Sequence, residues 1–146
     1  APARRKWILL VRQARSKAEL TRRLVRRGAE ASDAQAAADW LEGIGAVDDP
    51  AYAAALARHY GQRGYGPARV RQELQRRGVS RELWEEALGE LPDSSGILDA
   101  LIQKRCRGDL SDPREIKRLS DGLMRRGFSW GEVKAALSRY TELQEE

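Results

Sequence analysis

The chain has 146 residues, of which 34% are charged and 6% are aromatic, and it carries a formal net charge of +5. A chain of this length can bury a core as one domain or as a short array, and its positive charge favours an anionic partner. Residues 8–11 form the longest run of Ile, Leu and Val, which is too short for a signal sequence or a membrane span. Because no membrane span is present in the sequence, we expect a protein that does not contact a membrane. The one cysteine, Cys106, allows no internal disulfide and no cysteine metal site, so we expect a reducing compartment, the cytoplasm.

One helix ending occurs three times and divides the sequence into repeats. The motif Leu-x-Arg-Arg-Gly closes at Gly28, Gly78 and Gly127, with spacings of 50 and 49 residues. Arginines in a last helical turn interact favourably with the helix dipole, and glycine supplies the left-handed residue that ends many helices. A period of this size indicates a repeat architecture. The predicted repeats, each of three helices, cover residues 1–46, 47–92 and 93–146.

The elements between these endings are all predicted to be helices. No segment alternates in the manner of a strand, whereas capping boxes begin at Ser16, Ser32, Asp112 and Ser129. Pro67 suits a first helical position. The predicted helices span residues 7–15, 17–27, 33–42, 50–60, 67–77, 81–90, 96–107, 113–126 and 130–143, and residues 91–96 form the predicted hinge. The fold class is therefore predicted to be all-α, as an elongated array of three tandem three-helix repeats.

Apolar residues four apart predict the side of each helix that faces the core. In the middle helix of each repeat these are Leu20 and Leu24, Val70 and Leu74, and Leu119 and Leu123. In the third helix the corresponding pairs are Ala36 and Trp40, Trp84 and Leu88, and Val133 and Leu137. This register predicts that Trp40 and Trp84 are core residues, with Trp84 and Leu74 buried against each other's repeat.

The sequence contains almost nothing from which a catalytic site could be built. His59, the only histidine, has no nucleophile motif near it, and we interpret it as a packing or helix-terminal residue. The pair Asp48-Asp49 is interpreted as a cap for the helix that starts at Pro50, and Gly64-Tyr65-Gly66 as a tight turn. We therefore expect a protein that is not an enzyme, with no cofactor and no metal.

Arginines on the middle helices are the candidate binding residues. A projection at about 100° per residue places Arg69 with Arg76, and Arg118 with Arg125, on one exposed face. In the first repeat Arg26 is present, but Glu19 replaces the other arginine. Two interpretations stay open, a solvated face and a surface that contacts phosphates or carboxylates.

Other basic and aromatic residues near these arginines also carry two interpretations. The second arginine of each closing motif is interpreted as a helix-end residue beside the core; these are Arg27, Arg77 and Arg126. Trp130 is interpreted either as a residue that packs against the previous repeat or as an exposed anchor.

Four motifs at matching spacing resemble the RecX family, the bacterial regulators of the RecA recombinase. The most specific one is Gly64-Tyr-Gly-Pro-x-x-Val70-x-x-Glu-Leu-x-x-x-Gly78-Val. The others are Arg15-Ser-x-x-Glu-Leu20, Leu41-x-x-x-Gly-x-x-Asp-Asp-x-x-Tyr-Ala53 and Arg125-Arg-Gly-Phe-Ser129. The resemblance covers nearly the whole chain. It implies a curved, all-helical array that binds the RecA filament near its DNA and inhibits strand exchange and ATP turnover, in DNA repair, homologous recombination and the SOS response.

Two functions therefore stay open at the level of sequence. The first is a monomeric regulator that binds the RecA–DNA filament, with weaker or indirect contacts to single- or double-stranded DNA. The alternative is an autonomous basic helical module that binds DNA. The candidate contact residues in both cases are Arg69, Arg76, Arg118, Arg125, Arg26 and Trp130.

Overall fold

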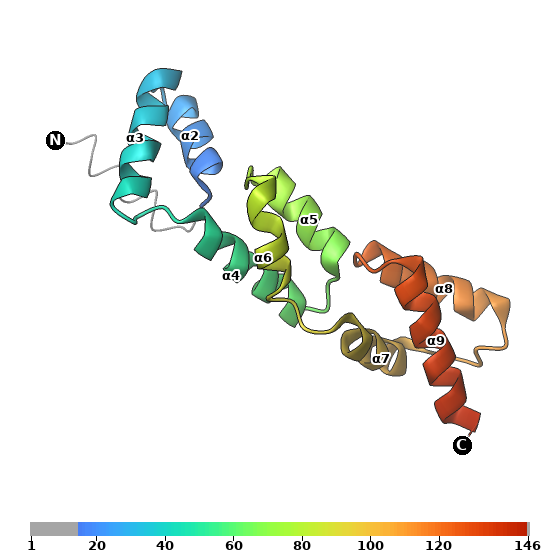
Figure 1. The fold of residues 1–146 in the computed structure, drawn as a ribbon. Coiled ribbons are helices and arrows are strands. Elements are labelled where there is room, and N and C mark those ends of the chain that lie inside the picture. The colour runs from blue at the N-terminus through green and yellow to red at the C-terminus, as the bar shows by residue number, and fades with distance from the viewer. Residues whose placement is uncertain (1–14, 146) are drawn as a thin grey trace. The chain divides into compact units, whose positions relative to one another are not determined.

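Helices form all of the regular secondary structure in residues 15–145, the part of the chain that the computed structural model describes (Figure 1). They are α2 (Lys17–Arg26), α3 (Ala31–Gly43), α4 (Asp49–Gln62), α5 (Pro67–Arg76), the 3-10 helix η1 (Arg81–Leu83), α6 (Trp84–Leu88), α7 (Ser94–Arg105), α8 (Pro113–Arg125) and α9 (Trp130–Glu145). The predicted all-α class is confirmed over this range. The helix predicted for residues 7–15 lies outside the described residues except for Arg15.

The three closing glycines adopt the left-handed conformation that the sequence predicts. Their φ angles are 103° at Gly28, 72° at Gly78 and 98° at Gly127. At the end of α5 the amide of Val79 donates to the carbonyl of Leu74 at 3.0 Å, and the amide of Gly78 donates to that of Gln75 at 3.0 Å. This pair of bonds is the Schellman motif, which satisfies carbonyls that the helix leaves free. The same pair closes α2, from Ala29 to Leu24 and Gly28 to Val25, and α8, from Phe128 to Leu123 and Gly127 to Met124.

Two of the four predicted capping boxes form in full. At Ser16 and at Ser129 the hydroxyl accepts from the amide three residues on, and the glutamate there accepts from the serine amide. At Asp112 the carboxylate caps through the amide of Arg114 at 2.9 Å, without the reciprocal bond. The prediction at Ser32 is wrong, because α3 already begins at Ala31.

The described residues form two compact units, each with its own small core. The first unit comprises the described residues up to Leu56 together with Glu73–Ala87, and the second comprises Ala57–Gln72 together with Leu88 onward. Buried residues of α2 and α3 make the main cluster of the first unit; they are Leu20, Leu24, Ala34, Ala37 and Leu41, with Val47 after α3. The cluster of the second unit comes from α7, α8 and α9 and consists of Leu98, Ile102, Leu119, Leu123, Phe128, Val133, Ala136 and Leu137.

The predicted core position of Trp40 is wrong, since 48% of this residue is exposed. The buried residues of α3 are Ala34, Ala37, Ala38 and Leu41, so the apolar stripe lies one residue later than the pair Ala36 and Trp40 predicts. The prediction counted the helix from a cap at Ser32, whereas the residue before the helix is Glu30. A shift of one residue turns a helical side chain by about 100°, which carries Trp40 out to solvent.

Trp84 is half-buried and not a fully buried core residue, which corrects its predicted place opposite Leu74. Its indole N–H donates to the carbonyl of Val79 at 3.0 Å, and the guanidinium of Arg81 lies 5.4 Å from its ring. The amphipathic indole is thus held at the edge of the unit, where one side stays in contact with polar groups. The predicted pair Val133 and Leu137 is buried as expected.

The segments on either side of residue 90 also differ from prediction. The helix predicted for residues 81–90 is a 3-10 turn followed by a short α6 that ends at Leu88. Residues 91–96 were predicted as a hinge, but α7 already begins at Ser94, because the carboxylate of Asp93 accepts from the amide of Ser95 at 3.2 Å and caps the helix.

Each unit contains a junction of the same design between two segments that are about 60 residues apart in the sequence. In the first unit the hydroxyl of Ser16, the N-cap of α2, donates to the carbonyl of Arg77. In the second unit the amide of Gly66, just before α5, donates to the carbonyl of Arg126 at 2.7 Å. In both units, a residue at the start of a middle helix donates to the carbonyl of the second arginine in a Leu-x-Arg-Arg-Gly motif about 60 residues later. The first of these junctions places Arg76 and Arg77 beside α2.

Candidate functional site

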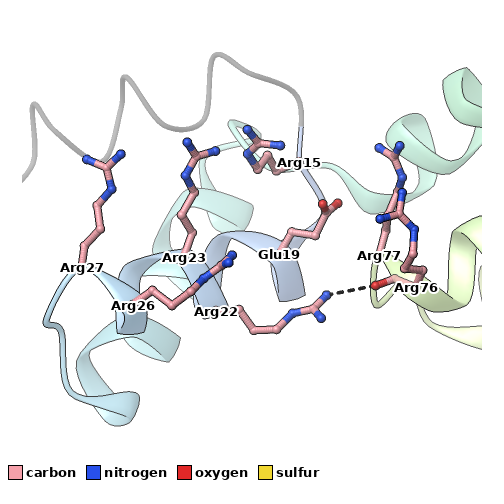
Figure 2. A pocket seen from close by; sticks show the side chains of 8 residues that line it. All are labelled: Arg15, Glu19, Arg22, Arg23, Arg26, Arg27, Arg76 and Arg77. Atoms are coloured by element: carbon pink, nitrogen blue, oxygen red, sulfur yellow. Dashed lines mark hydrogen bonds between the residues drawn. The ribbon is translucent and has the colours of Figure 1, made fainter.

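A hollow of about 590 Å³ in the first unit is lined almost entirely by arginine side chains (Figure 2). We call it the arginine hollow; its lining residues are Arg15, Arg22, Arg23, Arg26, Arg27, Arg76, Arg77 and Glu19. Figure 2 shows the arginines of α2 on one side and Arg76 and Arg77 on the other, with Arg15 and Glu19 between them. Seven cationic side chains thus surround one space together with one carboxylate.

Helix α2 and its C-cap residue, Arg27, supply four of these arginines because of their spacing. Arg22 and Arg26 are four residues apart, as are Arg23 and Arg27, so each pair lies on neighbouring turns of one helix edge. Leu20 and Leu24 are buried on the side of the helix opposite Arg22 and Arg26, whereas Arg23 and Arg27 flank this buried side. The pKa of Arg23 is lowered by burial first and then by the charges of Arg15, Arg27 and Arg26. The arginines are therefore close enough to repel one another, and a bound anion would relieve that repulsion.

The end of α5 supplies the other wall, and a buried carboxylate fixes it. Glu73, only 5% exposed, accepts from Arg76 Nη2 at 2.8 Å and from Arg77 Nε at 3.3 Å. Burial raises the pKa of Glu73, but the bonds from Arg76 and Arg77 outweigh it and leave the pKa below its ordinary value. Arg22 Nη2 reaches across from α2 to the carbonyl of Arg76 at 3.4 Å (Figure 2).

Tyr52 of α4 links the two walls through one hydroxyl group. The hydroxyl donates to Glu19 Oε1 at 2.9 Å and accepts from Arg77 Nη1 at 2.6 Å. Burial lowers the pKa of Arg77, but the bonds to Tyr52 and Glu73 outweigh it, so that the pKa is raised overall and the guanidinium stays charged. Glu19 also accepts from the amide of Ser16 at 3.3 Å in the capping box. The position of the carboxylate is therefore set by structural bonds on both sides.

Two of the six predicted contact residues, Arg26 and Arg76, lie together in the arginine hollow. The other four belong to the second unit. Arg69 is half-buried, with its guanidinium 5.6 Å from the Tyr65 ring and 6.0 Å from the Tyr60 ring, and so does not lie on a fully exposed face as predicted.

The remaining predicted residues are on or near the surface of the second unit. Arg118 donates to the Glu115 carboxylate and to the carbonyl of Arg105 at 2.7 Å, and Arg125 is exposed. Trp130 is 49% exposed and borders an apolar groove of about 480 Å³ with Leu110 and Ile116.

The other members of the hollow were not singled out as contact residues from the sequence; they are Arg15, Arg22, Arg23, Arg27 and Arg77. The doublets Arg22-Arg23 and Arg26-Arg27 could have predicted a basic face on this helix, because two arginine pairs four residues apart lie on neighbouring turns. Nothing local to the sequence shows that α5 faces them, since this depends on the bond between Ser16 and Arg77 across 61 positions.

The remaining part of the described chain offers no competing chemical centre. Within residues 15–145 no group of three or more His, Cys, Asp or Glu side chains could hold a metal ion, and no helix is long and apolar enough to cross a membrane. His59 is exposed in the last turn of α4 and meets the Tyr60 ring edge-on with centroids 5.5 Å apart, which agrees with its interpretation as a helix-terminal residue.

Two family models match the chain. One, described as the second three-helix domain of RecX, matches residues 48–88, and the other, the third three-helix domain of RecX, matches residues 97–137. Together they cover more than half of the sequence.

Several curated relatives carry the name regulatory protein RecX. One from Xanthomonas oryzae pv. oryzae is 38% identical over 138 residues, which cover 92% of this chain and 86% of the relative. One from Chromohalobacter salexigens is 35% identical over 135 residues, which cover 92% of this chain and 89% of the relative.

Solved structures support the same fold. A crystal structure of RecX from Lactobacillus salivarius has a TM-score of 0.76 at 15% identity and covers 92% of this chain and 94% of its own. A second crystal structure, of regulatory protein RecX, has a TM-score of 0.75 at 22% identity. The matched region covers 85% of this chain but only 65% of the solved chain, which is less than two thirds of its length.

Proposed function

Since this chain belongs to the RecX family of regulatory proteins, we propose that it regulates the RecA recombinase by binding the RecA–DNA filament and inhibiting strand exchange and ATP turnover. In this proposal the protein acts as a monomer in the cytoplasm and without a cofactor. Each of its three sequence repeats, residues 1–46, 47–92 and 93–146, contributes candidate contact residues.

The observation that carries the proposal is the arginine hollow. A filament of protein and DNA presents phosphates and carboxylates, and guanidinium groups bind both through paired hydrogen bonds. Seven arginines surround one space, and two of them, Arg76 and Arg77, are held in place by the buried Glu73 and by Tyr52. Arg26 and Arg76 contact the filament from the hollow, and Arg69, Arg118, Arg125 and Trp130 make further contacts from the second unit.

The test removes four exposed arginines and measures filament binding. A variant with Arg26, Arg76, Arg118 and Arg125 changed to Ala should keep its helical content, because Arg77 still bonds Glu73 when Arg76 is removed and the other exposed substitutions rarely exceed about 0.5 kcal/mol each. Arg69 is left in place because its contacts with Tyr60 and Tyr65 would confound the result. The dissociation constant for RecA on single-stranded DNA should rise about tenfold or more, and the parent's affinity should fall with added salt.

A matched control removes the same charge elsewhere, by changing the exposed Arg58, Arg71, Arg107 and Arg114 to Ala. Its dissociation constant should stay within about threefold of the parent's. Equal filament affinity in the test variant and the parent contradicts the assigned residues. Loss of binding to bare DNA, with filament binding and inhibition unchanged, would instead favour an autonomous DNA-binding module.

A further inference from the structure

The chemistry of the arginine hollow restricts what it can hold. Every cationic residue in its lining is arginine, whose planar guanidinium presents five donors in a fixed geometry and stays charged. The hollow is about 590 Å³, within the range of small-molecule sites, so that it has room for several anionic groups.

The positive charge of the lining greatly exceeds the negative charge near it. Two carboxylates approach the arginines, and both have defined structural partners. Glu19 accepts from the Tyr52 hydroxyl and the Ser16 amide, and Glu73 accepts from Arg76 and Arg77. The lowered pKa of Arg23, caused by burial and then by three neighbouring arginines, is consistent with a strongly positive local field.

We propose that the arginine hollow is a binding site for a run of two or more phosphate groups. The inference deepens the proposed function, on which it rests for the biological setting. Two sources share this chemistry: the backbone of single-stranded nucleic acid, and a free oligophosphate such as the triphosphate of a nucleotide.

The number of converging donors favours phosphates over carboxylates. A carboxylate has two oxygens, which one guanidinium can satisfy in a paired contact. A terminal phosphate has three strong acceptor oxygens. A phosphodiester of a nucleic-acid backbone has two non-bridging oxygens, and consecutive phosphates add further acceptors within a short distance. Carboxylates along an extended peptide point alternately to opposite sides, so that fewer of them enter one hollow. Arginines that approach from α2, from α5 and from residue 15 therefore match phosphates better than an acidic peptide.

The test measures binding by the full chain in the absence of RecA. The probes are inorganic tripolyphosphate, a 15-nucleotide oligo(dT) and an oligo-glutamate with the same charge as the oligo(dT). The variant changes Arg22, Arg23 and Arg27 to Gln, and leaves Arg26 and Arg76, which the proposed function uses, in place. The control changes Arg71, Arg107 and Arg114 of the second unit to Gln.

We expect tripolyphosphate and oligo(dT) to compete for the parent protein. Tripolyphosphate at 100 times its dissociation constant should raise the melting temperature by about 5–10 °C. Both dissociation constants should rise about tenfold or more in the hollow variant and change by less than about 1.5-fold in the control. The probe that binds the parent more tightly at equal salt identifies the source of the phosphates.

Equal binding of either probe to the hollow variant and the parent would overturn the proposal, as would oligo-glutamate binding as tight as that of oligo(dT). Circular dichroism checks that the variant is folded. If it is not, the single change of the exposed Arg27 to Gln should still weaken tripolyphosphate binding about threefold, and an unchanged constant counts against the site. RecA is absent from all of these measurements. A failure of the phosphate site would therefore not decide whether the protein binds the RecA–DNA filament, which the filament titration tests separately.

Discussion

Gly78 lies so close to Ala18 that a β-carbon at position 78 would be 2.5 Å from the Ala18 β-carbon. The second unit repeats this relationship, since a β-carbon at Gly127 would be 2.4 Å from the backbone nitrogen of Arg69. Both glycines follow the second arginine of a closing motif, and both meet the first turn of a middle helix. Glycine is therefore required there for the approach of two segments as well as for the end of a helix.

The first prediction separates these two roles by a comparison of Gly78→Ala with Gly28→Ala. Both residues have positive φ, 72° and 103°, so both changes strain the backbone by about 1 kcal/mol. A β-carbon at Gly28 meets nothing within 4 Å, whereas at Gly78 it meets Ala18. Gly78→Ala should therefore cost a further 1–3 kcal/mol, roughly, as overpacking does. Denaturant unfolding measures both, and equal losses would contradict the close junction.

The second prediction concerns the hydroxyl of Tyr52. Tyr52→Phe removes the bonds to Glu19 and Arg77 and leaves a half-buried guanidinium with one partner fewer, at a cost of about 1–3 kcal/mol. Tyr65→Phe keeps the ring that Arg126 covers at 4.9 Å and serves as the control, with a smaller expected loss. Thermal unfolding compares the two variants, and a Tyr52→Phe variant as stable as the parent would show that the hydroxyl bridge contributes nothing.

The third prediction is a dependence of stability on pH through Glu73. The pKa of Glu73 is below its ordinary value in the folded protein, so the unfolded chain binds the proton more readily. The stabilisation is present above the unfolded pKa, about 4.5, and is lost as the pH falls through the lower folded value. Urea unfolding between pH 7 and pH 3 should show a steeper loss for the parent than for Glu73→Gln. Parallel curves would mean that Glu73 is not the carboxylate responsible.

The fourth prediction compares the two tryptophans whose positions differ from the sequence-based register. Trp84→Ala removes a half-buried ring and its bond to Val79, and should cost about 2–4 kcal/mol. Trp40→Ala removes a residue that is 48% exposed and should cost less than about 1 kcal/mol. Chemical denaturation measures both losses, and a loss for Trp40→Ala as large as that for Trp84→Ala would restore the predicted core position of Trp40.

Several features of this protein are determined locally and could therefore be predicted from the sequence. The Schellman ends at Gly28, Gly78 and Gly127 depend on residues within one turn, as do the capping boxes at Ser16 and Ser129. The apolar pairs of the middle helices are set by the period of the helix itself. The family resemblance rests on the same motifs and is confirmed.

Other features depend on contacts between distant segments, and only the tertiary structure decided them. The exposure of Trp40 follows from where α3 starts, a difference of one or two residues that propensities do not resolve. The arginine hollow exists because Ser16 binds the carbonyl of Arg77 and Gly78 admits Ala18, contacts that bring the end of α5 to α2 across about 60 residues. Sequence periodicity assigns each arginine to a side of its own helix. Which of those sides face one another is set by long-range packing, and the convergence of the seven arginines follows from that packing.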